Sequence, residues 1–303
     1  DRRARPARLR RSLVVAQIAL SLTLLITAAL FFQSLSRTLS VDPGFDPKGL
    51  AIVSFDLDLQ GYTPNRRATF AAQLVERASA LPDVMSAATA NILPLGGEMY
   101  FGTIVSEDGA SSRATQASVS QRYFETLRLP LVRGREFSSV DIAANAPVAI
   151  VNETMARRLW PDTDPLGKRV RMTESEESWR EVVGVASDAK YLFLTESPMA
   201  AYYVPQPLPS ASTLIVRTAG SPRTALASLT NVARDLDPDL PLFRPQTMEE
   251  RIRRTAAQQR GVVSLLGVLG TLTLLLASVG IYGVVAHSVL PRTRIPSTNG
   301  RSR

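Results

Sequence analysis

The sequence contains no cysteine and a single histidine among its 303 residues. Without cysteine there are neither disulfides nor thiolate metal sites. The histidine, His287, directly follows a hydrophobic run, so the rest of the chain has neither a Ser-His-Asp triad nor an imidazole metal site. We therefore expect no catalytic residue, no metal ligand and no bound cofactor, although chemistry based on carboxylates alone stays open.

The remaining chemical motifs are weak. The segment P-L-G-K-R at 165–169 has a Gly-Lys pair but lacks the G-x-x-x-x-G-K-[ST] pattern of a phosphate loop. Three acidic groups lack the spacing of a known Ca²⁺ loop and are more simply explained as solvated surface charge; they are Asp56/Asp58, Glu174/Glu176/Glu177 and Asp235/Asp237/Asp239. Four aromatic residues could line a ligand surface, but core packing is the simpler role; they are Trp160, Trp179, Tyr202 and Tyr203.

The formal charge of +8 is concentrated at the two ends of the chain. Residues 1–11 hold six Arg and one Asp, and residues 287–303 hold four Arg. Between them, residues 12–286 hold 25 basic and 26 acidic side chains, which nearly cancel. This distribution gives no basic face for DNA or RNA, so we expect no nucleic-acid partner.

Two uncharged runs have the length of a membrane span. The longer holds no charge over residues 261–286 and would extend roughly 39 Å as a helix, against a hydrocarbon core of about 30 Å. Arginines flank the outer ends of both runs, which indicates cytoplasmic ends. The predicted order is a cytoplasmic tail (1–11), a transmembrane helix (12–33), an extracytoplasmic domain (34–260), a second transmembrane helix (261–286) and a cytoplasmic tail (287–303). Membrane lipid is thus an expected partner.

The first run leaves two questions open. A signal peptide has an apolar core of about 7–15 residues that ends at small side chains. Here the run ends in Phe31 and Phe32, which favours an uncleaved anchor. Polar residues recur on roughly one side of it, where they either bond to neighbouring transmembrane helices or are satisfied by their own helix backbone; they are Gln17, Ser21, Thr23 and Thr27.

The region between the runs predicts an α+β domain. Residues 51–59 alternate as a half-buried strand, Thr63-Pro64 begins a helix with an apolar stripe, and residues 84–90 form a second strand. The apolar stripe is formed by Phe70, Leu74, Ala78 and Leu81. A second strand–helix–strand unit follows at 212–244, so we expect a pseudo-symmetric layer built from both units.

Residues 121–200 predict an inserted β-rich lobe between these two units. We expect short helices at 121–127 and 152–160, the second capped by Asn152, and a strand at 180–186. Residues 247–260 contain neither Pro nor Gly and predict a stalk helix that continues into the second membrane span. Such a helix would transmit movement, or would simply connect the two regions.

Several motifs occur in order along the chain: V-D-P-G-F-D-P, L-P-L-G-G, Y-F-E-T-L-R-L-P-L-V-R-G-R-E-F, V-A-I-V-N-E-T-M-A-R-R-L-W-P, D-L-D-P-D-L-P and V-G-I-Y-G-V-V-A. Together they resemble bacterial MacB-like/FtsX-like ABC-transporter permeases, most closely the duplicated orphan permease group. The resemblance implies a membrane protein of the bacterial inner membrane. Its two transmembrane helices would flank a large α+β periplasmic core domain with an inserted β-rich lobe.

The resemblance also implies a non-enzymatic permease subunit. It would transmit movement driven by a separate cytoplasmic ABC ATPase, act as a homodimer and contact a possible periplasmic partner. Residues 295–303 diverge from the family pattern, which predicts truncation after the second transmembrane helix and weakens the expected ATPase contact. The alternatives are a two-helix membrane sensor with an extracytoplasmic ligand domain, an anchored hydrolase, and a non-functional fragment.

Overall fold

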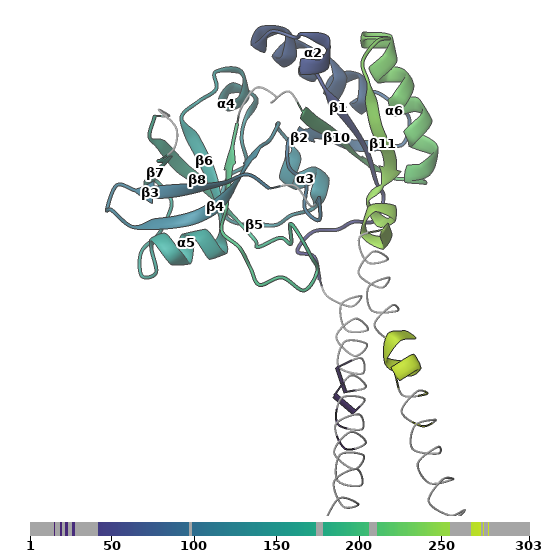
Figure 1. Ribbon diagram of the computed structural model, residues 1–303. Coiled ribbons are helices and arrows are strands. Elements are labelled where there is room, and N and C mark those ends of the chain that lie inside the picture. The colour runs from purple at the N-terminus through teal and green to yellow at the C-terminus, as the bar shows by residue number, and fades with distance from the viewer. Residues whose placement is uncertain are drawn as a thin grey trace, which may run out of the picture. The chain divides into compact units, whose positions relative to one another are not determined.

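The computed structural model describes most of the chain between the hydrophobic runs (Figure 1). The described residues are 42–96, 99–173, 178–205, 211–254 and 268–273, with the single positions 15, 19, 22, 23, 26, 27, 275 and 278. The chain divides into two compact units, residues 1–40 with 256–303 and residues 41–255.

The described positions of the first unit are all helical. Thr23 Oγ1 donates a hydrogen bond to Ala19 O at 2.9 Å, and Thr27 Oγ1 donates one to Thr23 O at 2.7 Å. These two hydroxyls are therefore satisfied by their own helix. Among the described positions, no helix combines the length and the apolarity that crossing a membrane requires. The predicted spans lie largely, and the tails wholly, outside the described residues.

The second unit contains a four-stranded antiparallel sheet in the order β11-β1-β10-β2. Its elements are β1 (Leu50–Asp56), a short 3₁₀ helix (Asp58–Gln60), α2 (Pro64–Ser79), β2 (Val84–Ala90), β10 (Ala211–Thr218), α6 (Pro222–Leu236) and β11 (Leu242–Thr247). β10 lies between β1 and β2, and β1 lies between β10 and β11. The two predicted strand–helix–strand segments, β1-α2-β2 and β10-α6-β11, thus interlock as split β-α-β motifs in one sheet, which confirms the pseudo-symmetric layer. We call these elements the core lobe.

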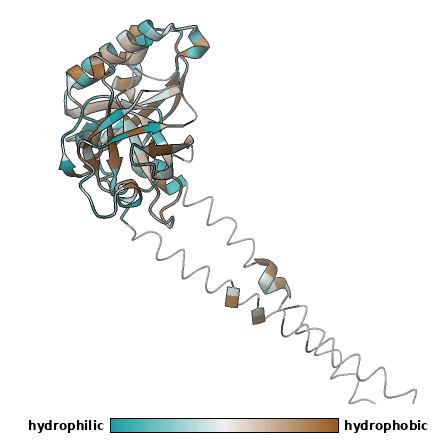
Figure 2. Ribbon diagram, turned by 90° about the vertical axis from the view of Figure 1, so that its left-hand side faces the viewer, coloured by the Kyte–Doolittle hydropathy of each residue, from teal (hydrophilic) through white to brown (hydrophobic). Residues whose placement is uncertain are grey.

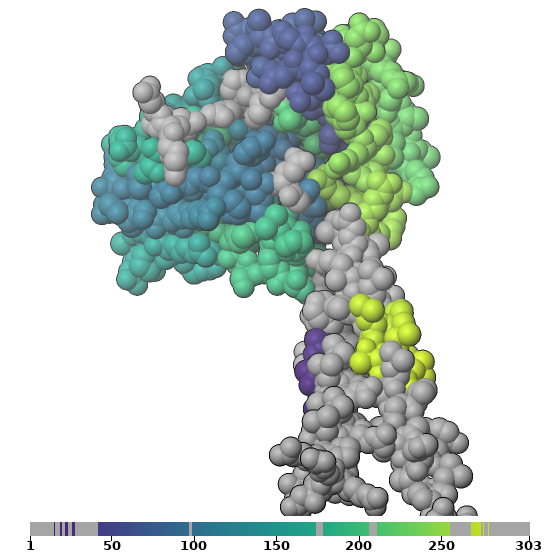
Figure 3. All heavy atoms as spheres, in the orientation of Figure 1, coloured from purple at the N-terminus to yellow at the C-terminus, as the bar shows by residue number. Residues whose placement is uncertain are grey.

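The core-lobe sheet is buried on both faces because its strands carry apolar side chains at successive positions. In β1, Leu50 and Ile52 point to one hydrophobic cluster, whereas Val53 and Phe55 point to another. α2 and α6 lie side by side over the second face (Figure 3). The predicted stripe on α2 is confirmed at its three buried helical positions, while Leu81 lies beyond the helix end.

The second sheet has seven strands in the order β5-β8-β6-β9-β4-β3-β7. β7 also pairs with β8, which closes six of the strands into a ring. The elements are β3 (Phe101–Ser106), β4 (Ser111–Ser118), α3 (Tyr123–Leu127), β5 (Leu131–Gly134), α4 (Ser139–Ala143), β6 (Val148–Asn152), α5 (Glu153–Leu159), β7 (Arg169–Met172), β8 (Arg180–Ala186) and β9 (Ala201–Val204). We call residues 99–205 the inserted lobe.

This lobe extends beyond the predicted range 121–200 at both ends, because β3, β4 and β9 belong to the same sheet. β4 reads S-S-R-A-T-Q-A-S, and its inward residues are small or hydroxylated rather than large and apolar. It therefore lacks the alternation by which a strand is recognised. The Asp108-Gly109 turn between β3 and β4 was the available hairpin signal, and Gly109 has the positive φ of +84° that such turns need.

Three hydrophobic clusters hold the second unit together. Its central strands carry many hydrophobic residues, drawn in brown in Figure 2. One cluster lies between the core-lobe sheet and its two helices, and another inside the strand ring, where Met155 and Leu159 of α5 pack. The third lies between the lobes and combines Ile52 and Ile215 of the core lobe with Phe124 and Tyr203 of the inserted lobe. The two lobes therefore share one core.

Candidate functional site: the joint between the two lobes

Most residues singled out by sequence lie in the core or in ordinary side-chain contacts. Trp160, Tyr202 and Tyr203 are buried, as core residues would be, whereas Trp179 is half-buried with the Arg171 guanidinium 5.0 Å from its ring centroid. Among the described residues, no three acidic or histidine side chains gather closely enough to hold a metal ion. His287 and the Glu174/Glu176/Glu177 group lie outside the described residues.

Several of the other candidates form ordinary ion pairs and hydrogen bonds. Asp58 pairs with Arg67, and Asp237 Oδ2 accepts a hydrogen bond from the Tyr62 hydroxyl at 2.6 Å. In the 165–169 segment, Lys168 lies 3.4 Å from Asp108. These side chains are therefore engaged in contacts within the chain.

The lobes are joined where β2 leaves the core-lobe sheet. Ala90 forms an isolated antiparallel bridge with Val119, just past the end of β4. Beside it, Thr89 N donates to Ser120 Oγ at 2.8 Å, and Ser120 N donates to Thr89 O at 2.9 Å. Ser118 N donates to the Asn91 side chain at 2.8 Å. This short ladder provides a defined joint between the lobes.

Arg217 of β10 is the centre of a buried polar cluster at the same joint. Its side chain is 4% exposed and donates hydrogen bonds of 2.7 Å each to three carbonyl oxygens, those of Asp46, Lys48 and Thr126. It thereby ties the leading segment, residues 42–49, to both lobes. Sequence reasoning missed Arg217 because its acceptors are distant in the chain; the only signal was a charge inside the apolar strand T-L-I-V-R-T.

Asp46 completes this cluster. Its carboxylate lies 3.4 Å from Arg217 Nη1 and accepts a hydrogen bond of 2.7 Å from Arg128 Nη1. Burial alone would raise the pKa of Asp46, but the Lys48 N–H and the charges of Arg128 and Arg217 lower it overall. Burial lowers the pKa of Arg217, and the Asp46 charge opposes that shift. The pair is therefore held in its ionised form.

Gly44 explains the turn in the leading segment. Its φ is +85°, and a Cβ there would lie 2.1 Å from the carbonyl oxygen of Asp188. Only glycine fits this backbone and this approach. The turn places Phe45 in the cluster between the lobes.

The trailing helix, residues 248–254, begins directly after β11. Thr247 and Glu250 form a reciprocal capping box, with hydrogen bonds of 3.0 and 3.1 Å between each backbone N–H and the other side chain. Met248 is buried in the cluster between the lobes, and Ile252 packs against it. Residues 248–254 of the predicted 247–260 stalk are therefore helical, whereas Thr247 ends β11 and residues 255–260 lie outside the description.

Arg251 attaches the trailing helix to the connection between the lobes. Its guanidinium donates to Leu95 O at 3.3 Å and to Gly96 O at 2.9 Å, in the loop after β2. Glu250 forms an ion pair with Arg223 at the start of α6. The trailing helix thus contacts the core lobe and the crossing between lobes.

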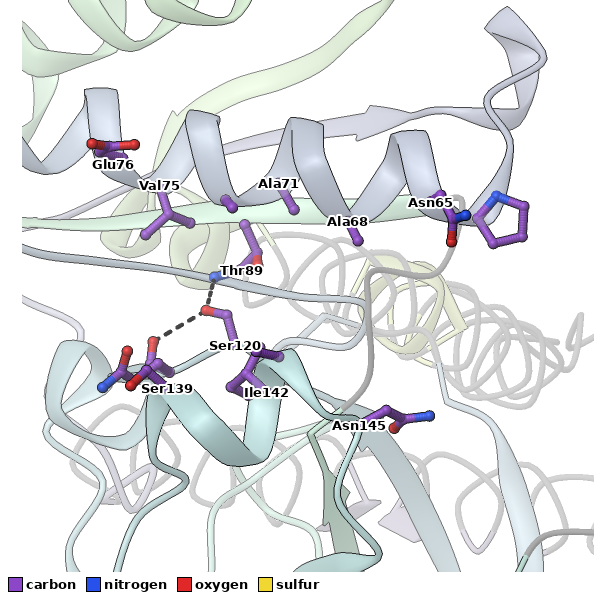
Figure 4. A pocket seen from close by; sticks show the side chains of 14 residues that line it. Asn65, Ala68, Ala71, Val75, Glu76, Thr89, Ser120, Ser139, Ile142 and Asn145 are labelled. Atoms are coloured by element: carbon purple, nitrogen blue, oxygen red, sulfur yellow. Dashed lines mark hydrogen bonds between the residues drawn. The ribbon is translucent and has the colours of Figure 1, made fainter.

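A groove of about 570 Å³ lies between α2 of the core lobe and α4 of the inserted lobe (Figure 4). Ala68, Ala71 and Val75 line the α2 side, and Ile142 lines the α4 side. Thr89 and Ser120 of the joint ladder form its floor. Sequence reasoning gave no indication of this groove, because its lining comes from four separate segments of the chain.

Comparison with known proteins gives a consistent assignment. Residues 12–235 match the family described as MacB-like periplasmic core domain. The macrolide export ATP-binding/permease protein MacB of Azoarcus sp. (strain BH72) is 24% identical over 242 residues, covering 76% of this chain and 36% of that protein. The uncharacterized ABC transporter permease YknZ of Bacillus subtilis (strain 168) is 24% identical over 190 residues, covering 60% of this chain and 47% of that protein.

Among solved structures, the periplasmic region of MacB from Actinobacillus actinomycetemcomitans matches with a TM-score of 0.48 and 18% identity. The match covers 69% of this chain and 94% of that one. The chain spans less than half the length of the two curated relatives, at 36% and 47%.

Proposed function

This chain belongs to the family with a MacB-like periplasmic core domain, and on that basis we propose that it is a non-catalytic permease component of an ABC-type transporter. In this proposal residues 12–33 and 261–286 cross the bacterial inner membrane. Residues 34–260 lie in the periplasm, and the terminal segments 1–11 and 287–303 lie in the cytoplasm. The uneven distribution of arginine supports this orientation.

One structural observation carries the proposed mechanism. Phe45 of the leading segment and Met248 of the trailing helix pack in the single cluster that lies between the lobes. Because packed cores shift between discrete arrangements rather than deforming gradually, displacement of either segment would act on both lobes. The hydrogen bonds of Arg251 to the connecting loop support the same coupling.

We therefore propose mechanotransmission. A separate cytoplasmic ABC ATPase would move the membrane helices, and the trailing helix would pass that movement to the joint between the lobes. The same proposal includes a homodimer embedded in lipid and a partner protein in the periplasm. The chain itself would carry out no chemistry.

Topology is tested by single-cysteine labelling, since the natural chain has no cysteine. A membrane-impermeant maleimide should label Gln73→Cys, which is exposed on α2, in intact spheroplasts. It should label Arg3→Cys only after the membrane is permeabilised. The reverse pattern would reject the proposed orientation.

Transmission is tested by the distance between spin labels at Gln73→Cys on α2 and Arg158→Cys on α5, both exposed. With a copurified ABC ATPase, addition of ATP should change the distance distribution, and Arg251→Ala should reduce that change. If the distance distribution does not change with ATP although the ATPase hydrolyses it, movement between the lobes is ruled out. The proposed membrane topology would not be affected by that result.

A further inference from the structure

We infer that the groove between α2 and α4 binds a small amphipathic molecule with an apolar body and a hydrogen-bond-accepting oxygen. Its volume of about 570 Å³ is within the roughly 300–1,000 Å³ typical of small-molecule sites. The groove contacts both lobes, so a bound molecule would bridge them. This inference does not depend on the proposed transport function.

The groove is open because its α2 wall is built from small side chains. Phe70 and Leu74 face the sheet on the buried side of the helix. The neighbouring stripe, Ala68, Ala71 and Ala72, lines the groove with methyl groups only. Larger side chains at these positions would fill the space, so the sequence of α2 maintains an apolar hollow rather than a packed contact.

A buried hydroxyl on the floor indicates what the hollow would bind. Thr89 is 1% exposed, and within the described part of the chain its Oγ1 has no hydrogen-bond partner. Its side chain points from β2 toward α2, into the groove (Figure 4). A buried hydroxyl without a partner is unfavourable. An acceptor oxygen on a ligand would remove that penalty.

The charge of the lining restricts the ligand further. Of the described residues that line the groove, Glu76 alone is charged, and it lies at one end. Ser120 Oγ is already engaged, because it accepts a hydrogen bond from Thr89 N and donates one to Gln121 O at 3.1 Å. The site therefore favours uncharged amphipathic molecules and disfavours anions.

The test measures protection of a cysteine placed at the groove in the full chain, reconstituted in lipid nanodiscs. The probe is progesterone, a rigid uncharged molecule with ketone oxygens, and the anionic steroid cholate serves as its comparison. Progesterone should slow maleimide labelling of Ala72→Cys at least fivefold at saturation, and cholate should not. Gln73→Cys, one position along α2 and outside the lining, controls for partitioning into lipid and should be unaffected.

The hydroxyl is tested on the Ala72→Cys background. Thr89→Val should raise the half-protecting progesterone concentration about fivefold, as the loss of one neutral hydrogen bond predicts, whereas Thr89→Ser should restore protection. Unchanged labelling without probe shows that each variant is folded. Absence of progesterone protection, or equal protection of Gln73→Cys, overturns the inference. The inference is also overturned if Ala72→Cys is labelled slowly without probe and faster when the protein is diluted. That result would identify a second copy of the chain as the occupant of the groove.

Discussion

Asp141, in the short helix α4, is held by a dense set of donors. Its carboxylate accepts hydrogen bonds from Arg135 Nη1 at 2.6 Å, Ser138 Oγ at 2.7 Å and Ser138 N at 2.8 Å. The Arg135 bond is the largest cause that lowers its pKa, burial opposes it, and the Ser138 bonds add to the lowering, which together bring the pKa to about 2. The native state thus favours the ionised form more than the unfolded chain does.

Asp141→Asn tests this linkage. Because the folded pKa of about 2 lies below the ordinary value of 3.8, the stabilisation is complete above about pH 4 and is lost as the pH falls toward 2. The variant should unfold with about 2 kcal/mol less free energy than the natural chain at pH 6. Urea titrations at pH 6, 4 and 2.5 should show that gap closing. Asp108→Asn, at an exposed pair, is the control, and a gap at Asp141 that stays constant with pH would contradict the assignment.

Arg217 provides a second test at this scale. Arg217→Met would leave the Asp46 carboxylate short of a partner and three carbonyl oxygens without their donor. The Arg217 side chain is 4% exposed and Asp46 is 30% exposed, so the pair is only partly buried, and loss of these charged hydrogen bonds should cost about 2–3 kcal/mol. Arg128→Met is the matched control, because that side chain is 55% exposed and pairs with the same carboxylate, so its loss should cost less than about 1 kcal/mol. Equal midpoints of thermal unfolding for the two variants would refute this role of Arg217.

At the scale of elements, the start of helix α5 is capped by one buried side chain, that of Asn152. Asn152 is fully buried, and its Oδ1 accepts from Met155 N at 3.0 Å and from Ala201 N at 2.9 Å. Its Nδ2 donates to Asp188 Oδ1 at 2.6 Å and to Met199 O at 2.7 Å. The residue therefore caps the helix and also joins it to β9.

Asn152→Ala should consequently cost more than an ordinary cap. Loss of a cap costs about 1 kcal/mol, and the buried groups left without partners raise the expected loss to about 3 kcal/mol or more. Ser138→Ala, which removes the capping side chain of α4, should cost about 1 kcal/mol. The measurement is the denaturation midpoint of each variant. Equal losses would mean that the Asp188 and Ala201 contacts of Asn152 contribute nothing.

Elements with local signals were the ones that sequence could predict. Thr63-Pro64 begins α2 and Asn152 caps α5 as expected, because each signal lies within a few residues of the structure it sets. β3 and β4 were missed because their burial depends on a sheet closed by distant strands. The joint was missed for the same reason: Arg217 bonds to Thr126 and Asp46, which are near to it only after folding.

At the scale of the whole molecule, the shared cluster between the lobes predicts that they unfold together. Both tryptophans of the chain, Trp160 and Trp179, belong to the inserted lobe, so their fluorescence reports on that lobe. Leu74 lies in the core lobe, fully buried between α2 and the sheet. Leu74→Ala should cost about 2–5 kcal/mol through lost burial and a cavity.

If the lobes form one cooperative unit, Leu74→Ala should lower the urea midpoint seen by tryptophan fluorescence as much as the midpoint seen by loss of secondary structure. The exposed neighbour Gln73→Ala should leave both midpoints unchanged. A tryptophan transition that stays at its natural midpoint while the secondary-structure transition falls would mean that the lobes unfold separately. In that case the cluster between them would be too weak to pass movement from the trailing helix to the inserted lobe.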